Sequence, residues 1–276
     1  MRSASEAPAE EPRTSSARPD RASASGSRLE IAGLGHGFGS LEVIERLDLA
    51  LAPGELLGLV GPSGCGKSTL LELVAGLSEP GRGTIAIGGE RASRARLAGC
   101  AYMPQRDLLL PWLSAIDNAG LAIRNRGGSR VEARAQAAPL FERFGLAGFE
   151  SATPAELSGG MRQRVAFLRT LLAGKPILLL DEPFAFLDAI TRAEMQSWLA
   201  RGLAAEARTV LLVTHDVEEA LYLCDRVVVL SERPSRAVAE LRAPTPRELP
   251  RNHVVADPSF VALRERALAA LERGGR

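Results

Sequence analysis

The sequence has few of the features that mark secreted or membrane-spanning proteins. Its three cysteines, Cys65, Cys100 and Cys224, are scattered and form no CxxC pair, which argues against disulfide bonds and a zinc site. No apolar run approaches the roughly 18 residues that would suggest a membrane span. No charged start followed by an apolar segment suggests a signal peptide. We therefore expect a protein of the reducing cytoplasm that serves a membrane, if it serves one, from outside the bilayer.

Lysine is also scarce, because Lys67 and Lys175 are the only lysines among 34 basic residues. A lysine that remains in such an arginine-rich chain needs an explanation. Lys175 precedes a proline at the expected end of a helix, where any cation suits the helix dipole. The formal net charge of +1 argues against a broad nucleic-acid surface, because such binding depends on clustered basic side chains. We therefore expect no nucleic-acid partner.

Composition divides the chain into three parts. Residues 1–27 are rich in Ser, Ala, Pro, Arg and Glu, have almost no large apolar side chain, and are predicted to be a disordered tail. A transit peptide is the alternative, but the acidic residues of this segment count against it. Residues 28–236 form the predicted packed domain. Residues 237–276 form a C-terminal extension, predicted as an extended connector from about residue 235 and then a helix over FVALRERALAALER.

Strand and helix patterns alternate within the packed domain. Almost continuously apolar runs, such as LLGLVG (56–61), ILLLDEP (177–183) and VLLVT (210–214), are typical of parallel strands covered on both faces. Gly-rich, strand-like segments occupy residues 28–54. Residues 106 to about 156 look helical and Arg-rich. The sequence therefore predicts an α/β fold with a helical insertion.

The segment GPSGCGKST matches GxxxxGK[ST] and lies between an apolar strand and an apolar helix, the context that indicates a phosphate-binding loop. Its glycines let the backbone wrap closely around phosphates, with N–H groups inward at the positive end of a helix. Lys67 is expected to reach the β- and γ-phosphates as a compact charge that planar arginine replaces poorly, and Ser68 to hold Mg²⁺. Cys65 is expected to fill space rather than act as a nucleophile. The predicted nucleotide-binding residues of this loop are Gly61, Pro62, Ser63, Gly64, Cys65, Gly66, Lys67, Ser68 and Thr69.

Polar residues follow several predicted strands at the edge where ligands bind in open parallel sheets. Asp181 suits a magnesium-binding role, and Glu182 could face the γ-phosphate and deprotonate water. A strand-end charge pair is the alternative for Glu182. His215 follows VLLVT, where a histidine is more often structural but could contact the γ-phosphate side. Gln105 follows CAYMP, where it could sense Mg²⁺ and the attacking water. Phe38 is either a core residue or a stacking platform for adenine.

With these residues in place, the chain resembles the ATP-binding subunit of ABC transporters. The likeness runs from Arg28 to about Arg236 and rests on motifs in the family's order: Phe38 at the aromatic A-loop position, the Walker A loop, Gln105 of the Q-loop, LSGGM as the signature, Walker B through Glu182, Asp188 of the D-loop and His215 of the switch loop. A P-loop alone is shared by many NTPases, whereas this combination is very specific. The resemblance implies an α/β P-loop NTPase (RecA-like) core, an antiparallel β subdomain and a helical signature subdomain at about residues 106–160.

The resemblance also implies a mechanism. Two subunits would form a head-to-tail homodimer around two ATPs, each held between the Walker A loop of one subunit and the signature of the other. Glu182 would be the catalytic base, His215 the γ-phosphate contact and Asp188 a link across the interface. The catalytic residues would be Glu182, His215 and Gln105, and the Mg²⁺-binding residues Ser68, Gln105 and Asp181.

The signature LSGGMRQR looks like a helix start, with Ser158 as a natural N-cap, although Gly159 and Gly160 have poor helix propensity. The resemblance places this turn against another subunit's γ-phosphate. There the glycines would permit close approach and the positive end of the helix would face the charge. Met161 departs from the family's usual Gln and removes an amide. Because Ser158 and both glycines remain, we expect activity to survive.

The first part of the helical insertion, residues 106–122, is unusually apolar for a surface. Part of it suits a core, while Leu108–Leu110 and Trp112 are predicted to dock the membrane partner, since tryptophan is a strong interface anchor. The chain resembles the nitrate/sulfonate/taurine importers in four segments: PQRDLLLPWLSAIDNA, LSGGMRQR, LSERPSR and ELPR. Importers of thiamine-precursor pyrimidines have similar segments. The resemblance implies transmembrane permease subunits, a solute-binding protein and a peripheral place on the cytoplasmic face of the inner membrane.

Three other functions fit the sequence less well. An ABC ATPase of DNA repair or of ribosomes would need a long coiled-coil insertion or two tandem cassettes, for which this sequence has no room. A small-molecule kinase with a P-loop would not need a signature or a switch histidine. A purely regulatory nucleotide-binding module would have no use for Glu182 with His215, which together favour hydrolysis.

Overall fold

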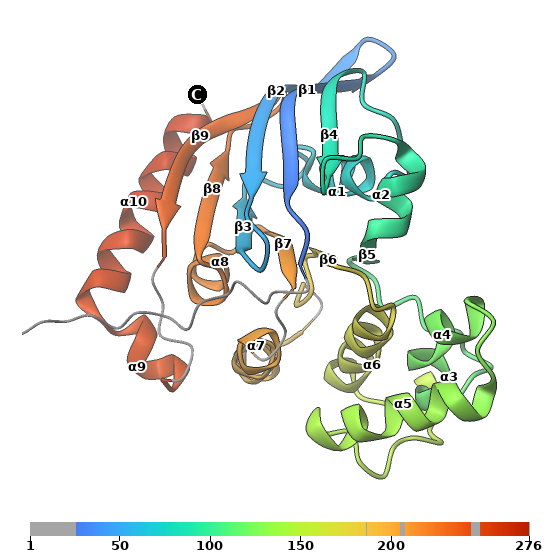
Figure 1. Cartoon of the computed structure of the whole chain (residues 1–276). Helices are drawn as coiled ribbons and strands as arrows, with labels where there is room; N and C mark the ends of the chain where they lie inside the picture. The colour runs from blue at the N-terminus through green and yellow to red at the C-terminus, as the bar shows by residue number, and fades with distance from the viewer. Residues whose placement is uncertain (1–25, 186, 205–207, 244–248, 276) are drawn as a thin grey trace, which may run out of the picture.

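The computed structural model describes residues 26–185, 187–204, 208–243 and 249–275 (Figure 1). The predicted disordered tail, residues 1–27, lies almost entirely outside these described residues. Within them the strands form one sheet in the order β4-β1-β2-β9-β8-β3-β7-β6-β5. Its two halves differ in strand direction and are described separately below.

Five parallel strands form one end of the sheet, with β5 at its edge: β3 (Leu56–Val60), β5 (Cys100–Met103), β6 (Ile177–Asp181), β7 (Thr209–Thr214) and β8 (Arg226–Leu230). Every residue of β3, β6 and β7 is buried, which explains their almost continuously apolar sequences. The predicted α/β class is confirmed. Because β7 lies between β3 and β6, the carboxyl ends of these three strands meet at one edge of the sheet, where the candidate site residues follow.

Strands outside this parallel set extend the sheet on the side of β8: β1 (Leu29–Phe38), β2 (Leu41–Leu51), β4 (Arg82–Ile87) and β9 (Ser235–Arg242). β1 pairs antiparallel with both β2 and β4, as the predicted antiparallel subdomain requires. The connector expected from about residue 235 is instead β9, antiparallel to β8 and parallel to β2. Only Ser235 and Leu241 of β9 are buried, so its sequence lacks the apolar alternation that would predict a strand. The domain boundary expected between residues 236 and 237 falls inside this strand.

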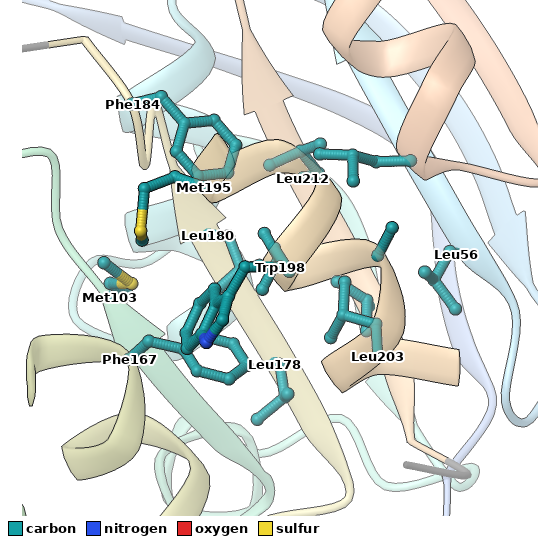
Figure 2. Packing of buried hydrophobic residues seen from close by; sticks show 14 of the residues in the cluster. Leu56, Met103, Phe167, Leu178, Leu180, Phe184, Met195, Trp198, Leu203 and Leu212 are labelled. Atoms are coloured by element: carbon teal, nitrogen blue, oxygen red, sulfur yellow. The ribbon is translucent and has the colours of Figure 1, made fainter. Parts of the chain in front are cut away.

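Helices cover both faces of the parallel strands: α1 (Lys67–Ala75), α2 (Ser93–Gly99), α6 (Gly159–Leu172), α7 (Ala189–Ala204) and α8 (Val217–Leu223). Alternate residues of β3 point into two separate cores. Leu56 and Val60 belong to the first core, and Leu57 and Leu59 belong to the second. Figure 2 shows the first core, where Phe167 and Trp198 pack edge to face with ring centroids 5.3 Å apart. Burial of each such side chain stabilises the fold by about 1.5–3 kcal/mol.

The helical insertion forms a separate lobe at the lower right of Figure 1, made of α3 (Ala115–Ala119), α4 (Leu121–Asn125), α5 (Arg130–Arg143) and the 3₁₀ turn η2 (Pro154–Glu156). Asp117 of α3 is buried and receives hydrogen bonds from Arg134 and Arg130 of α5, their Nε atoms 2.8 and 3.0 Å from its Oδ1. These two guanidinium groups hold the pKa of Asp117 well below its usual range. The lobe is therefore fastened by a charged network as well as by apolar packing.

Two helices of the C-terminal extension, α9 (Arg251–Val255) and α10 (Pro258–Gly274), pack against α8, and α10 also covers β8 and β9. The predicted terminal helix is α10, which begins at the N-cap Asp257 and buries Phe260, Ala267 and Ala270. None of the helices in the described part of the chain is long and apolar enough to cross a membrane.

Candidate active site

The phosphate-binding loop connects β3 to α1 at the carboxyl edge of the sheet. Gly66 caps α1 with φ at 108°, a left-handed conformation that glycine adopts readily, and a Cβ there would lie 2.6 Å from Cγ1 of Val43. Lys67 is buried within the loop, where its Nζ donates to the carbonyl oxygens of Gly61 at 2.8 Å and Pro62 at 3.0 Å. The loop thus holds its lysine folded against the backbone that would surround a phosphate.

Two further side chains are associated with this loop. Cys65 is buried, and burial raises the pKa of its thiol, so the group stays neutral and fills space, as expected from the sequence. Arg233, between β8 and β9, is a residue that the sequence reasoning missed. Its Nη2 lies 3.1 Å from the place that a Cβ would take on Gly64. The signal was present in LSERPSR, but nothing local indicates that this turn folds back onto the loop.

Asp181 ends β6 beneath the phosphate loop. Burial raises the pKa of its carboxyl group, while hydrogen bonding to Ser68 and Tyr102 and the charge of Lys67 lower it. The Tyr102 hydroxyl donates to Oδ2 at 3.0 Å, whereas the buried Oδ1 has no hydrogen-bond partner among the described residues. A buried carboxylate oxygen left without a donor, beside a serine hydroxyl, fits a Mg²⁺ site, because oxygen atoms are the ligands that Mg²⁺ prefers.

Glu182 lies at the centre of a contiguous polar cluster. Its Oε2 accepts a hydrogen bond from Gln105 Nε2 at 3.3 Å and lies 3.1 Å from Nδ1 of His215, and its Oε1 lies 3.8 Å from Nζ of Lys67. The backbone of Glu182 has φ at 42°, which is unusual for a residue other than glycine. Strain of this kind is concentrated at functional sites. The structure therefore brings together Lys67, Gln105, Glu182 and His215, which are far apart in the sequence.

Phe38 ends β1 and is 56% exposed, so the alternative of a core residue is wrong. Its ring meets that of His36 edge to face, with centroids 4.9 Å apart. His36 is thus a second aromatic neighbour that the sequence reasoning missed. An exposed ring supported from the side suits stacking against a flat ligand.

The signature residues form the first turn of α6. Ser158 is its N-cap, and its Oγ accepts a hydrogen bond from the backbone N–H of Met161 at 3.2 Å. Among the described residues, a Cβ added to Gly159 would meet the side chains of Leu187 and Arg162 within 4 Å, at 3.7 Å or more, so no described side chain requires glycine there. Met161 packs partly against the apolar core. A Cβ added to Gly160 would lie 3.0 Å from Cγ2 of Thr191, and at neither glycine would it meet a described residue of the phosphate loop within 4 Å.

Asp188 precedes α7 and accepts hydrogen bonds from the backbone N–H groups of Ile190 and Thr191, both at 3.1 Å. Hydrogen bonding to Thr191 and Ile190 lowers the pKa of this exposed carboxyl group. In this chain Asp188 therefore caps a helix, and its predicted role across an interface stays a prediction.

Comparisons with known proteins agree with this geometry. Residues 44–185 match the family model described as "ABC transporter". The formylaminopyrimidine import ATP-binding protein ThiZ of Halalkalibacterium halodurans is 45% identical over 205 residues, 74% of this chain and 80% of that protein. The aliphatic sulfonates import ATP-binding protein SsuB 1 of Rhodococcus jostii is 44% identical over 243 residues, 88% of this chain and 93% of that protein. The ATP-binding cassette MJ0796, solved as a dimer in a post-hydrolysis state with ADP and Pi, aligns with a TM-score of 0.68 at 27% identity, covering 78% of this chain and 98% of that one.

Proposed function

The chain belongs to the ABC transporter family, and from this premise we propose that it is the ATP-hydrolysing subunit of an importer for a small solute. The observation that carries the proposal is the cluster around Glu182, in which a carboxylate contacts a lysine of the phosphate loop, a glutamine and a histidine. These are the groups needed to hold a triphosphate and to orient and deprotonate the water that attacks it.

The residues divide into binding and catalytic roles. The loop from Gly61 to Thr69 would cradle the phosphates of ATP with its backbone N–H groups, and Phe38 would stack on the adenine. Ser68, Asp181 and Gln105 would hold Mg²⁺, which neutralises charge on the phosphates when bound. Glu182 would accept the proton of the attacking water, and His215 would contact the γ-phosphate side and keep the carboxylate oriented.

A second copy of the chain would complete each site. The open space around Gly159 supports this arrangement, because no described side chain lies close enough to require a glycine there, and the glycine would allow another molecule's phosphate to approach the N-terminus of α6. The structural relative MJ0796 was solved as a dimer. Ser158, Gly159 and Gly160 of one copy would face the ATP of the other, and Asp188 would lie near the shared interface.

The cargo would be an organic solute such as a sulfonate, with a thiamine-precursor pyrimidine as the alternative. The sequence relatives include import ATPases for each of these classes. The ATPase would act peripherally at the cytoplasmic face of the membrane, coupled to a permease. A solute-binding protein would deliver the solute to that permease. A role outside transport is less well supported, since the described residues fold as a single cassette without a long coiled coil.

Trp112 is the best candidate for the anchor that docks the permease. It is 74% exposed, and Leu108 nearby is 58% exposed. The loop that carries Trp112 is rigid, because the buried Asn118 amide donates to the carbonyl oxygens of Leu110 and Leu113, each at 3.1 Å. Asn118 also accepts from the Leu110 N–H at 2.7 Å. A fixed, exposed aromatic side chain of this kind is typical of an interface anchor.

Replacing Trp112 with Ala is therefore expected to weaken binding to the permease by about 30-fold, the loss of roughly 2 kcal/mol that defines an interface anchor. The measurement is an affinity titration of the full chain against the permease in lipid nanodiscs. Val131→Ala is the matched control, because Val131 is 79% exposed on the same lobe. Equal affinities for the Trp112 variant and the parent would contradict the docking assignment.

The proposed function itself is tested by phosphate release. The full chain, alone and with its permease, is expected to convert ATP to ADP and inorganic phosphate. Removal of Mg²⁺ with a chelator should stop the reaction, and excess Mg²⁺ should restore it. ADP formed without inorganic phosphate would indicate a kinase instead. Turnover unaffected by the chelator would refute the magnesium assignment of Ser68, Gln105 and Asp181.

A further inference from the structure

The C-terminal extension reaches the back of the candidate active site through one arginine. Arg251 of α9 donates from Nε to Oε1 of Gln196 on α7 at 2.8 Å and forms an ion pair with Glu218 of α8. Its guanidinium group also lies over the ring of Tyr222, 5.8 Å from the centroid. The Arg251 side chain is 22% exposed. One side chain of the extension therefore connects α9 to both α7 and α8.

The contact with Gln196 continues inward to a second glutamate. Gln196 is 1% exposed, and its Nε2 donates to Oε2 of Glu219 at 3.4 Å. Burial raises the pKa of Glu219 to about 8, with the charge of Asp216 adding to the effect and the charge of Arg192 opposing it. Glu219 lines a small cavity that also includes Glu182 and His215. The chain of contacts from Arg251 thus ends beside the catalytic cluster.

Glu218 and Glu219 are also the residues that connect α8 to the switch loop. The N-cap Asp216 accepts hydrogen bonds from their backbone N–H groups at 2.9 and 3.1 Å. Asp216 in turn donates its own N–H to Oγ1 of Thr214 at 3.0 Å. His215 lies between Thr214 and Asp216, so this turn fixes its backbone. Arg251 in turn holds the helical side of the turn through the side chains of Glu218 and Gln196.

We propose that Arg251 is a positioning residue for ATP hydrolysis: by fixing the first turn of α8, it holds His215 in contact with the catalytic carboxylate of Glu182. The inference rests on the proposed function. Loss of Arg251 would leave the phosphate loop intact but release Gln196 and remove one of the two arginines that pair with Glu218. The first turn of α8 would then be free to shift, and this shift would weaken the 3.1 Å contact between His215 and Glu182. The C-terminal extension is, in this reading, part of the catalytic apparatus.

Arg264 of α10 provides an internal comparison. Its Nη1 lies 3.5 Å from Glu218 Oε2, so Glu218 receives charge from both helices of the extension. The contact with Gln196 belongs to Arg251, whose planar guanidinium serves two acceptors at once. Lysine at this position could keep the charge but not both contacts, which makes Arg251→Lys a graded test.

The experiment compares steady-state ATP hydrolysis by the full-length parent, Arg251→Ala and Arg251→Lys. We expect kcat, expressed per nucleotide-binding site, to fall about tenfold for Arg251→Ala and about threefold for Arg251→Lys, with KM for ATP unchanged within about twofold. Expressing kcat per nucleotide-binding site removes any unfolded chain from the comparison. Arg266→Ala is the matched control, because Arg266 is exposed on the same extension.

A charge swap makes the test independent of folding yield. In an Arg264→Ala background, which removes the cation that would repel an arginine at position 218, Arg251→Glu combined with Glu218→Arg is expected to recover at least part of the kcat that Arg251→Glu loses in that background. The proposal is overturned if kcat per site in both Arg251 variants equals that of the Arg266 control, or if only KM rises. Absence of turnover in the parent itself would instead contradict the proposed function, so the two failures are distinguishable.

Discussion

Replacing Glu182 with Gln is expected to lower the rate of ATP hydrolysis by about 10²–10³-fold and to leave ATP binding intact. A general base contributes roughly 10²–10⁴-fold to such reactions. Glutamine has the size of glutamate and can still meet Gln105 or His215, whose nitrogen atoms lie 3.3 and 3.1 Å from the carboxylate. It cannot take up a proton from water. The substitution therefore removes one chemical step and little of the packing.

The same variant is expected to accumulate as an ATP-bound dimer, because the step that lets the two copies separate no longer occurs. Size-exclusion chromatography with light scattering, in ATP and then in ADP, measures this directly. Glu194→Gln is the control, since Glu194 is an exposed carboxylate on α7. Hydrolysis at the parent rate in Glu182→Gln would show that another group is the base, and a variant that stays monomeric in ATP would contradict the two-copy site.

The parts of the site that the sequence predicted are those formed by short, continuous segments. The phosphate loop was predictable because its glycines, its lysine and its serine lie within nine residues between a strand and a helix. Asp181 and Glu182 were predictable because they end a strand that is buried at every position. In each case the local pattern alone determines where the backbone leads, so no long-range contact had to be known.

Residues that act across the fold were not predictable in the same way. Tyr102 reaches Asp181 because β5 pairs with β6 in a register that sets Tyr102 opposite Leu179, and neither sequence segment specifies that pairing. Arg251 meets Glu218 and Gln196, which lie 33 and 55 positions earlier in the sequence, so no local pattern indicates either contact. β9 was missed for a related reason, because an exposed strand is stabilised by its neighbours β8 and β2 rather than by its own apolar pattern.

Replacing Lys67 with Ala is expected to lower nucleotide affinity by 100-fold or more and to abolish measurable hydrolysis. Hydrogen bonds to charged groups contribute about 1.5–3 kcal/mol each, and Lys67 is the buried cation of the phosphate loop, 3.8 Å from Glu182. Its loss would also leave Glu182 and the buried Asp181 without the positive charge that offsets them. Isothermal titration with a non-hydrolysable ATP analogue measures the affinity.

Lys67→Arg separates the charge of this residue from its shape. The Nζ atom fits between the carbonyl oxygens of Gly61 and Pro62, and the side chain is 5% exposed, so the loop has no room for a planar guanidinium. We therefore expect Lys67→Arg to lose almost as much affinity as Lys67→Ala, although its net charge is unchanged. Lys175→Ala, at the other lysine, should bind nucleotide like the parent. Parent-like affinity in Lys67→Arg would mean that a positive charge alone suffices for nucleotide binding. The presence of lysine at this position, in a chain with 32 arginines, would then need a different cause.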